Sequence, residues 1–177
     1  MDLDEAEAAG HVTGSEGIET PGADAPSCVE TAVPVVEPVS YLGFLMGVDV
    51  YGLPLNHLRE VARLKRVRRI PGAPANVAGL MNLRGQIVCA LDTRHILCVP
   101  GPPPAGAGFL IALRGFPDPL GLVVDAVTDV YAVDPDSIEP SPAGWSAART
   151  AFTLGTVSIP RGLMTLLDLG PMIGMRA

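Results

Sequence analysis

The sequence of 177 residues predicts a mainly β protein, an expectation that rests on three observations. Valine, leucine, glycine and proline dominate the composition, and this mixture suits short strands and tight turns better than long helices. Short apolar stretches recur along the chain and are bounded by glycine and proline, as strands commonly are. A segment that starts at residue 51 is also repeated from residue 120, which indicates two related β units.

The first part of the expected β region begins near Tyr41, where the first long apolar stretch starts. We expect strands at 41–47, 50–55, 60–64 and 66–70, a turn at 71–74, a helical turn at 75–77, a hairpin over 79–92 and a helical turn at 93–97. The strands at 60–64 and 66–70 alternate apolar and polar residues, the pattern of strands with one buried face. Their predicted inward side chains are Val61, Leu64, Val67 and Ile70.

The second part follows a linker at 99–108 that is rich in proline and glycine. We expect strands at 109–114, 119–125, 127–133, 152–159 and 163–168, a polar loop at 134–151 and a short apolar segment at 169–175. Proline and small polar residues in the 134–151 segment favour a loop over regular structure.

The repeat relates residues 51–61 (YGLPLNHLREV) to residues 120–130 (LGLVVDAVTDV). In this alignment Gly52 matches Gly121, and Val61 matches Val130. Each copy is followed later by an apolar strand that ends in Leu-Asp and then by a short apolar tail. The repeat predicts two related half-domains, approximately 41–98 and 109–175, that bury more surface together than either could alone.

The negative charge of the chain is concentrated in its first residues. Residues 1–37 contain nine acids and no lysine or arginine, with no aromatic residue and no apolar periodicity, so we expect a disordered acidic tail. The remaining ten acids of the chain face twelve bases, which gives residues 38–177 a net charge of about +2.

The sequence predicts a cytoplasmic protein. The acidic N-terminus lacks the basic and apolar regions of a secretory signal. No apolar run approaches the roughly 18–20 residues of a membrane span, so we expect no direct membrane insertion. Cys28, Cys89 and Cys98 form no CxxC motif, and such a sparse set predicts free thiols in a reducing compartment.

Motifs of the common enzyme classes are missing from the sequence. It contains no GxSxG elbow and no GxxxxGK[ST] phosphate loop. The pair Asp125 and Asp129 suits capping and exposed edges as well as it suits acid–base work. No histidine has further ligands at the spacing of a metal site, which applies to His11, His57 and His95. We therefore expect a non-enzymatic protein without metal or cofactor.

A basic cluster within residues 63–69 permits three interpretations. Its members are Arg63, Lys65, Arg66, Arg68 and Arg69. A small β-barrel with a basic strand could bind nucleic acid, although such proteins usually stack bases on exposed aromatic residues and this cluster has none. The cluster could also be a solvated strand face or a charge-protected edge. The third possibility is a surface for an acidic partner.

Several motifs together carry a family resemblance. They are 44–52 (FLMGVDVYG), 58–61 (LREV), 70–74 (IPGAP), 77–85 (VAGLMNLRG), 87–88 (IV), 91–92 (LD) and 123–130 (VVDAVTDV). In this order they resemble the CheW-type coupling proteins of bacterial chemosensory systems, over nearly all of residues 41–175. The NLRG and VVDxVxDV elements in one chain make the resemblance specific.

The resemblance implies two SH3-like, five-stranded β-barrel subdomains packed together, with short helical turns. It also implies an adaptor that binds the regulatory domain of a CheA-type histidine kinase and the cytoplasmic tip of methyl-accepting chemoreceptors. Asn82 and Arg84 fall on the family's receptor-proximal motif, whereas no particular residue is assigned to kinase binding. The full set of positions that match receptor-binding or groove-lining segments of the family is Glu60, Val61, Asn82, Arg84, Val124, Val127 and Val130.

Overall fold

The structure, a computed structural model, describes residues 37–101, 108–145 and 147–174, and ten strands in two sheets dominate this part of the chain. These residues belong to one structural unit. The expected acidic tail, apart from Glu37, lies outside the described residues, as does most of the 99–108 linker.

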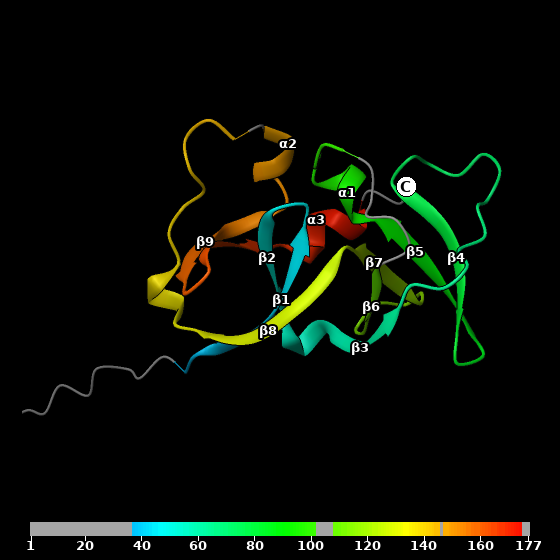
Figure 1. Cartoon of the computed structure of the whole chain (residues 1–177), viewed down its shortest axis with the longest axis horizontal. Coiled ribbons are helices and arrows are strands. Elements are labelled where there is room, and N and C mark those ends of the chain that lie inside the picture. Colours follow the sequence, from blue (N-terminus) through cyan, green and yellow to red (C-terminus); the bar gives the residue numbers. More distant parts are fainter. Residues whose placement is uncertain (1–36, 102–107, 146, 175–177) are drawn as a thin grey trace, which may run out of the picture. The chain divides into compact units, whose positions relative to one another are not determined.

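Five strands form the first sheet, in the order β8-β1-β2-β10-β9. Their bounds are β1 (Val39–Met46), β2 (Asp49–Pro54), β8 (Ala126–Val133), β9 (Thr153–Ile159) and β10 (Gly162–Leu167). The second sheet has the order β3-β6-β7-β5-β4. Its strands are β3 (Leu58–Arg63), β4 (Val77–Leu83), β5 (Gln86–Asp92), β6 (Phe109–Leu113) and β7 (Leu120–Val124). Both sheets are mixed, because β10 pairs with β2 and β5 pairs with β7 in parallel (Figure 1).

The short helices connect or follow these strands. They are η1 (Leu55–His57), α1 (Thr93–Ile96), η2 (Pro135–Ser137), α2 (Ala147–Thr150) and α3 (Leu169–Gly174). Helix α1 confirms the expected helical turn, and the Asp92 side chain caps it by accepting a hydrogen bond from the backbone N–H of His95. Asp168 stands before α3 in the same way and accepts from the backbone N–H of Gly170.

The sequence repeat is visible in the topology, but the sheets do not follow its boundaries. Strands β1 to β5 belong to the first copy and β6 to β10 to the second. The first sheet combines β1 and β2 with β8, β9 and β10, whereas the second combines β6 and β7 with β3, β4 and β5. Both sheets therefore have the same order of repeat positions, third-first-second-fifth-fourth. The expected halves 41–98 and 109–175 therefore do not each correspond to one sheet, because each sheet takes strands from both.

Each five-stranded sheet is open, because its two edge strands do not pair along their length to close a barrel. A single bridge crosses each open side: Glu139 pairs with Thr156 of β9, and Arg68 pairs with Leu80 of β4. At the second bridge the backbone N–H and C=O of both residues exchange hydrogen bonds of 2.8 Å. Gly79 beside it has φ +142°, and a Cβ there would lie 2.2 Å from the Arg68 carbonyl oxygen. Glycine thus permits the close approach of the two backbones.

Two local expectations are wrong in this region. Residues 66–70 do not form a strand, and only Arg68 pairs with a neighbouring strand. The helical turn expected at 75–77 is instead a turn at 75–76, after which Val77 begins β4.

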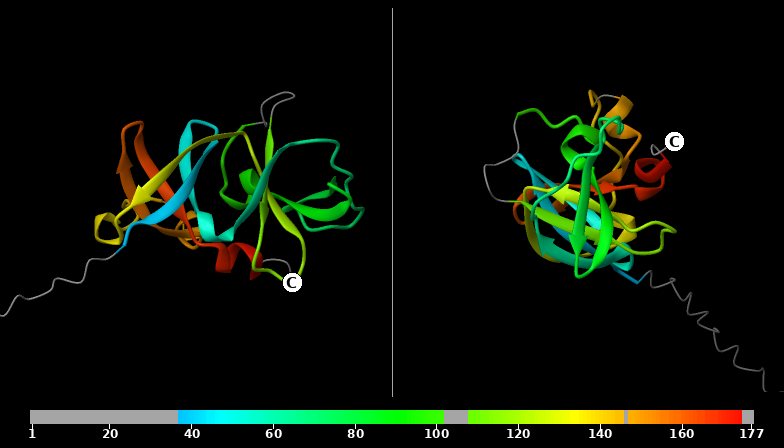
Figure 2. Two further views of the ribbon diagram at one scale, coloured as in Figure 1. Left: turned by 90° about the horizontal axis from the view of Figure 1, so that it is seen from below. Right: turned by 90° about the vertical axis from the view of Figure 1, so that its right-hand side faces the viewer.

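A continuous apolar core joins the two sheets, which lie side by side (Figure 2, left). Fully buried members of this junction core include Phe44, Tyr51, Leu53 and Leu167 from the first sheet, and Leu91, Ile111 and Leu122 from the second. Burial of each leucine or phenylalanine side chain contributes about 2 kcal/mol. The two sheets therefore stabilise each other.

Candidate functional site

The turn between β4 and β5 places an arginine in an unfavourable backbone conformation. Leu83 pairs with Gln86, so Arg84 and Gly85 form a two-residue hairpin loop. Both loop residues have positive φ, 49° for Arg84 and 88° for Gly85, which is the pattern of a type I′ turn. Such turns favour Asn-Gly, because a larger side chain is strained at positive φ. The Arg84 side chain is nevertheless 82% exposed, so burial does not explain why arginine stands there.

Strand β3 contacts this turn through two polar pairs. The Arg84 Nε lies 2.8 Å from the Glu60 Oε2, and the Arg59 guanidinium donates a hydrogen bond to the side chain of Gln86. Within the turn the Asn82 Oδ1 accepts from the backbone N–H of Gly85 at 2.9 Å. The structure therefore brings together three of the expected receptor-binding residues, Glu60, Asn82 and Arg84.

Val61 follows Glu60 and is more exposed than the sequence expectation. A β-bulge between Leu58 and Glu60 shifts the pairing of β3 with β6, and Val61 is 37% exposed. The expectation that Val61 and Ile70 are buried inward side chains is wrong, because Ile70 is 40% exposed and Val61 lies at an exposed position. Val61 stands opposite Ile111, a member of the junction core, and directly opposed residues share a face of the sheet. Val61 thus lies at the exposed margin of the junction between the sheets.

Strand β8 presents the equivalent position from the other repeat. Val130 matches Val61 in the repeat, stands opposite Leu42 of the junction core and is 55% exposed. Val127 is half-buried and packs against the same core. Val124 is only 1% exposed, so it supports the junction from inside and offers no surface to a partner.

A second polar network was not identified from the sequence. Arg94 of α1 pairs with Asp125, and their side chains are 12% and 13% exposed. The Asp125 carboxylate also accepts from the backbone N–H of Gly47 at 2.7 Å, while Arg94 donates to the carbonyl of Pro100 at 2.9 Å. The network ties α1 to the turns after β1 and β7. Asp125 lies within the 123–130 motif, but no sequence pattern links it to Arg94, which is 31 residues away.

Two tyrosines among the described residues have raised pKa values. Burial raises the pKa of Tyr51, an effect that Arg149 opposes and Asp49 reinforces, and burial also raises the pKa of Tyr41. Within the described residues, no three His, Cys, Asp or Glu side chains are grouped so that they could hold a metal ion. No helix in the same part of the chain is long and apolar enough to cross a membrane.

Comparison with known proteins agrees with the fold. Residues 40–176 match the family model of the CheW-like domain. The chain is 27% identical to the chemotaxis protein CheW of Klebsiella aerogenes over 133 residues, which cover 75% of the chain and 80% of that relative. It is 27% identical to the chemotaxis protein CheW of Treponema pallidum over 132 residues, 71% of the chain and 76% of the relative.

A solved structure gives the same result. The scaffolding protein TtCheW from Thermoanaerobacter tengcongensis superposes with a TM-score of 0.66 and 27% identity, over 75% of this chain and 85% of that one. The chain therefore belongs to the CheW-like domain family, the non-enzymatic scaffolding proteins of chemotaxis signalling.

Proposed function

We propose that this chain couples the cytoplasmic tip of methyl-accepting chemoreceptors to the regulatory domain of a CheA-type histidine kinase. It acts in the cytoplasm, at receptor arrays, and holds its two partners together without doing chemistry of its own. Membership of the CheW-like family supports this role.

The observation that carries the assignment is the conformation of Arg84. A non-glycine residue at positive φ costs of order 1 kcal/mol, and such strain is concentrated at functional positions. The Arg84 side chain is 82% exposed and touches Glu60 at the edge of the sheet. An exposed ion pair stabilises a fold by only about 0.5 kcal/mol, so this contact does not offset the strain by itself. A guanidinium in this place is well suited to bind an acidic or polar group of a partner.

The two exposed valines supply the apolar part of the proposed receptor contact. Val61 and Val130 lie at the margin of the junction, on the faces that carry the junction core. Apolar side chains of a receptor helical hairpin can cover them, with the half-buried Val127 behind them. An interface of roughly 1,200 Å² or less suits a reversible signalling contact of this kind.

The test is co-purification of the full chain with a receptor cytoplasmic fragment and a kinase regulatory domain. Arg84→Ala and Arg84→His should weaken receptor binding by about tenfold while kinase binding and folding persist. Arg161→Ala is the matched control, since Arg161 is an exposed arginine in the corresponding β9–β10 turn of the other sheet. If receptor binding survives both Arg84 substitutions, the assignment of Arg84 is refuted. Failure of the wild-type chain to bind either partner would refute the proposed function itself.

Nucleic-acid binding by the basic 63–69 segment is the rival function. Arg63 lies over the ring of Phe109 at 5.7 Å, but that ring is half-buried, and residues 61–76 contain no aromatic side chain on which a base could stack. A mobility-shift assay in moderate salt distinguishes the two functions. Tight, salt-sensitive binding to nucleic acid without kinase binding would replace the scaffold proposal.

A further inference from the structure

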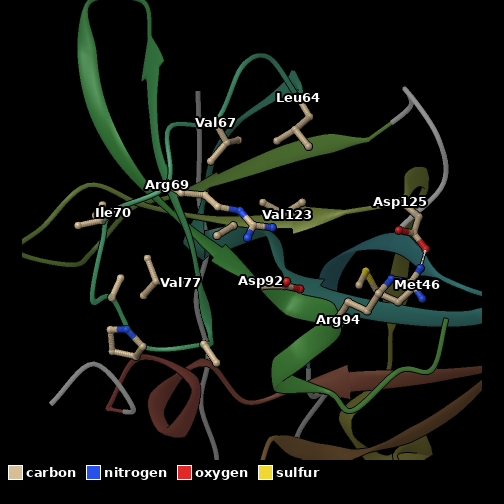
Figure 3. A pocket seen from close by; sticks show the side chains of 14 residues that line it. Met46, Leu64, Val67, Arg69, Ile70, Val77, Asp92, Arg94, Val123 and Asp125 are labelled. Atoms are coloured by element: carbon tan, nitrogen blue, oxygen red, sulfur yellow. Dashed lines mark hydrogen bonds and ion pairs between the residues drawn. The ribbon is translucent and has the colours of Figure 1, made fainter. Parts of the chain in front are cut away.

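A pocket of about 540 Å³ lies beneath the segment that connects β3 to β4 (Figure 3). Its apolar lining comes from Met46, Leu64, Val67, Ile70, Val77 and Val123. This volume is large enough to take one or two apolar side chains of a partner. The pocket is therefore a candidate for an anchoring contact.

The charged side chains inside the pocket balance one another. Arg69 and Arg94 line it together with Asp92 and Asp125. Figure 3 shows Arg94 paired with Asp125 at one side, and the structure records the Asp92 carboxylate as the cap of α1. The Nε of Arg94 is buried and has no hydrogen-bond acceptor within the described residues. A buried donor without an acceptor is costly to the fold.

The segment that covers the pocket, residues 63–69, forms a cationic rim, of which only Arg69 lines the pocket itself. Arg63, Lys65, Arg66, Arg68 and Arg69 are all exposed. The whole stretch from residue 61 to residue 91 contains no aspartate or glutamate. The positive field along this rim is therefore not neutralised by its own sequence neighbours, and it will attract and orient an anionic partner.

We propose that this pocket and its rim bind an acidic peptide segment of a partner protein. One apolar side chain of the segment enters the pocket, and carboxylates on either side pair with Arg66, Arg68 and Arg69. Residues 63–69 span about 20 Å if extended, which matches about six residues of an extended partner and exceeds most small molecules. The apolar interior, together with the lack of aromatic residues on the rim, favours a peptide over a nucleic acid.

This site is distinct from the proposed receptor contact. Val77, which lines the pocket, begins β4, whereas Arg84 follows the other end of the same strand. A strand of this length separates its ends by about 20 Å. Substitutions at one site can therefore be tested without altering the other.

The experiment measures the anisotropy of a fluorescein-labelled peptide made of glutamate and aspartate around one central leucine, with the full-length chain. We expect binding that weakens as salt is raised, and about tenfold weaker binding when the leucine is replaced by serine. Arg69→Glu should weaken binding by at least about tenfold, because it reverses a charge at the pocket. Arg161→Glu on the other sheet is the matched charge control and should leave the affinity nearly unchanged.

A second variant tests the pocket apart from the charges. Ala75 lines the pocket at an exposed position, so Ala75→Phe should block the mouth with the thermal unfolding midpoint preserved. Loss of peptide binding in Ala75→Phe, but not in Arg84→Asn, is the result expected. Equal binding of the leucine and serine peptides would overturn the proposal, because the surface would then recognise charge alone. Tighter binding of a single-stranded oligouridylate that Ala75→Phe does not affect would overturn it in favour of nucleic acid.

Discussion

Replacing Arg84 by asparagine separates function from stability at the β4–β5 turn. Asparagine tolerates positive φ, so the substitution should recover about 1 kcal/mol of backbone strain. It also removes the ion pair with Glu60, which is worth about 0.5 kcal/mol because the Arg84 side chain is 82% exposed. The net expectation is a gain of about 0.5 kcal/mol in the free energy of unfolding, or about 1–2 °C in the thermal midpoint.

The same substitution should abolish or strongly weaken receptor binding. Urea unfolding followed by circular dichroism measures the free energy of unfolding, and titration of a receptor fragment measures the affinity for the receptor. Arg161→Asn at the corresponding turn of the other sheet should change neither. A loss of more than about 1 kcal/mol on Arg84→Asn would show that the arginine is structural, and the reasoning from strain to function would be refuted.

Three further results are expected. Val61→Glu and Val130→Glu should each weaken receptor binding by at least about tenfold with an unchanged thermal midpoint, measured by calorimetry; unaltered affinity would contradict the assignment of the junction margin. Arg94→Ala should lower the free energy of unfolding by about 3 kcal/mol in urea, because it leaves the Asp125 carboxylate without its partner, and adding Asp125→Asn should recover part of the loss; a cost below about 1 kcal/mol would contradict a strong pair. Burial raises the pKa of Tyr51 above its ordinary value of 10.0, so the stability from its neutral phenol is complete below pH 10 and is lost as pH rises through the folded pKa. Phenolate absorbance during alkaline titration checks this, and ionisation of Tyr51 at its ordinary pKa in the folded protein would disprove it.

Local patterns in the sequence predict most strands correctly. The hairpin over 79–92 is observed as β4 and β5, and the helical turn expected at 93–97 is observed as α1. The short apolar segment expected at 169–175 forms α3, a helix that the sequence did not predict. The predicted features depend on neighbouring residues, namely apolar runs, turn glycines and capping aspartates. The orientation of β3 could not be read in this way, because the bulge at Leu58 and Glu60 shifts its pairing with β6.

The pairing of strands across the repeat was also hidden from sequence reasoning. The third strand of each copy could pair either with strands of its own copy or with strands of the other copy. No feature of the neighbouring sequence distinguishes these two pairings. The site shows the same limit: Asn82 and Arg84 stand out through a family motif, whereas the Arg94–Asp125 pair joins positions that only the tertiary structure brings together.

The exchange of strands between the repeats has a consequence for how such a molecule can assemble. A chain that contained one copy alone would leave β1 and β2 without the hairpin and edge strand that complete their sheet. Two such chains could complete both sheets only by trading those strands in a symmetric dimer. Joining the copies turns this bimolecular step into loop closure within one chain, at a high effective concentration. Neither sheet can then be complete before both copies have been synthesised, so folding and unfolding should be a single cooperative event for the whole unit.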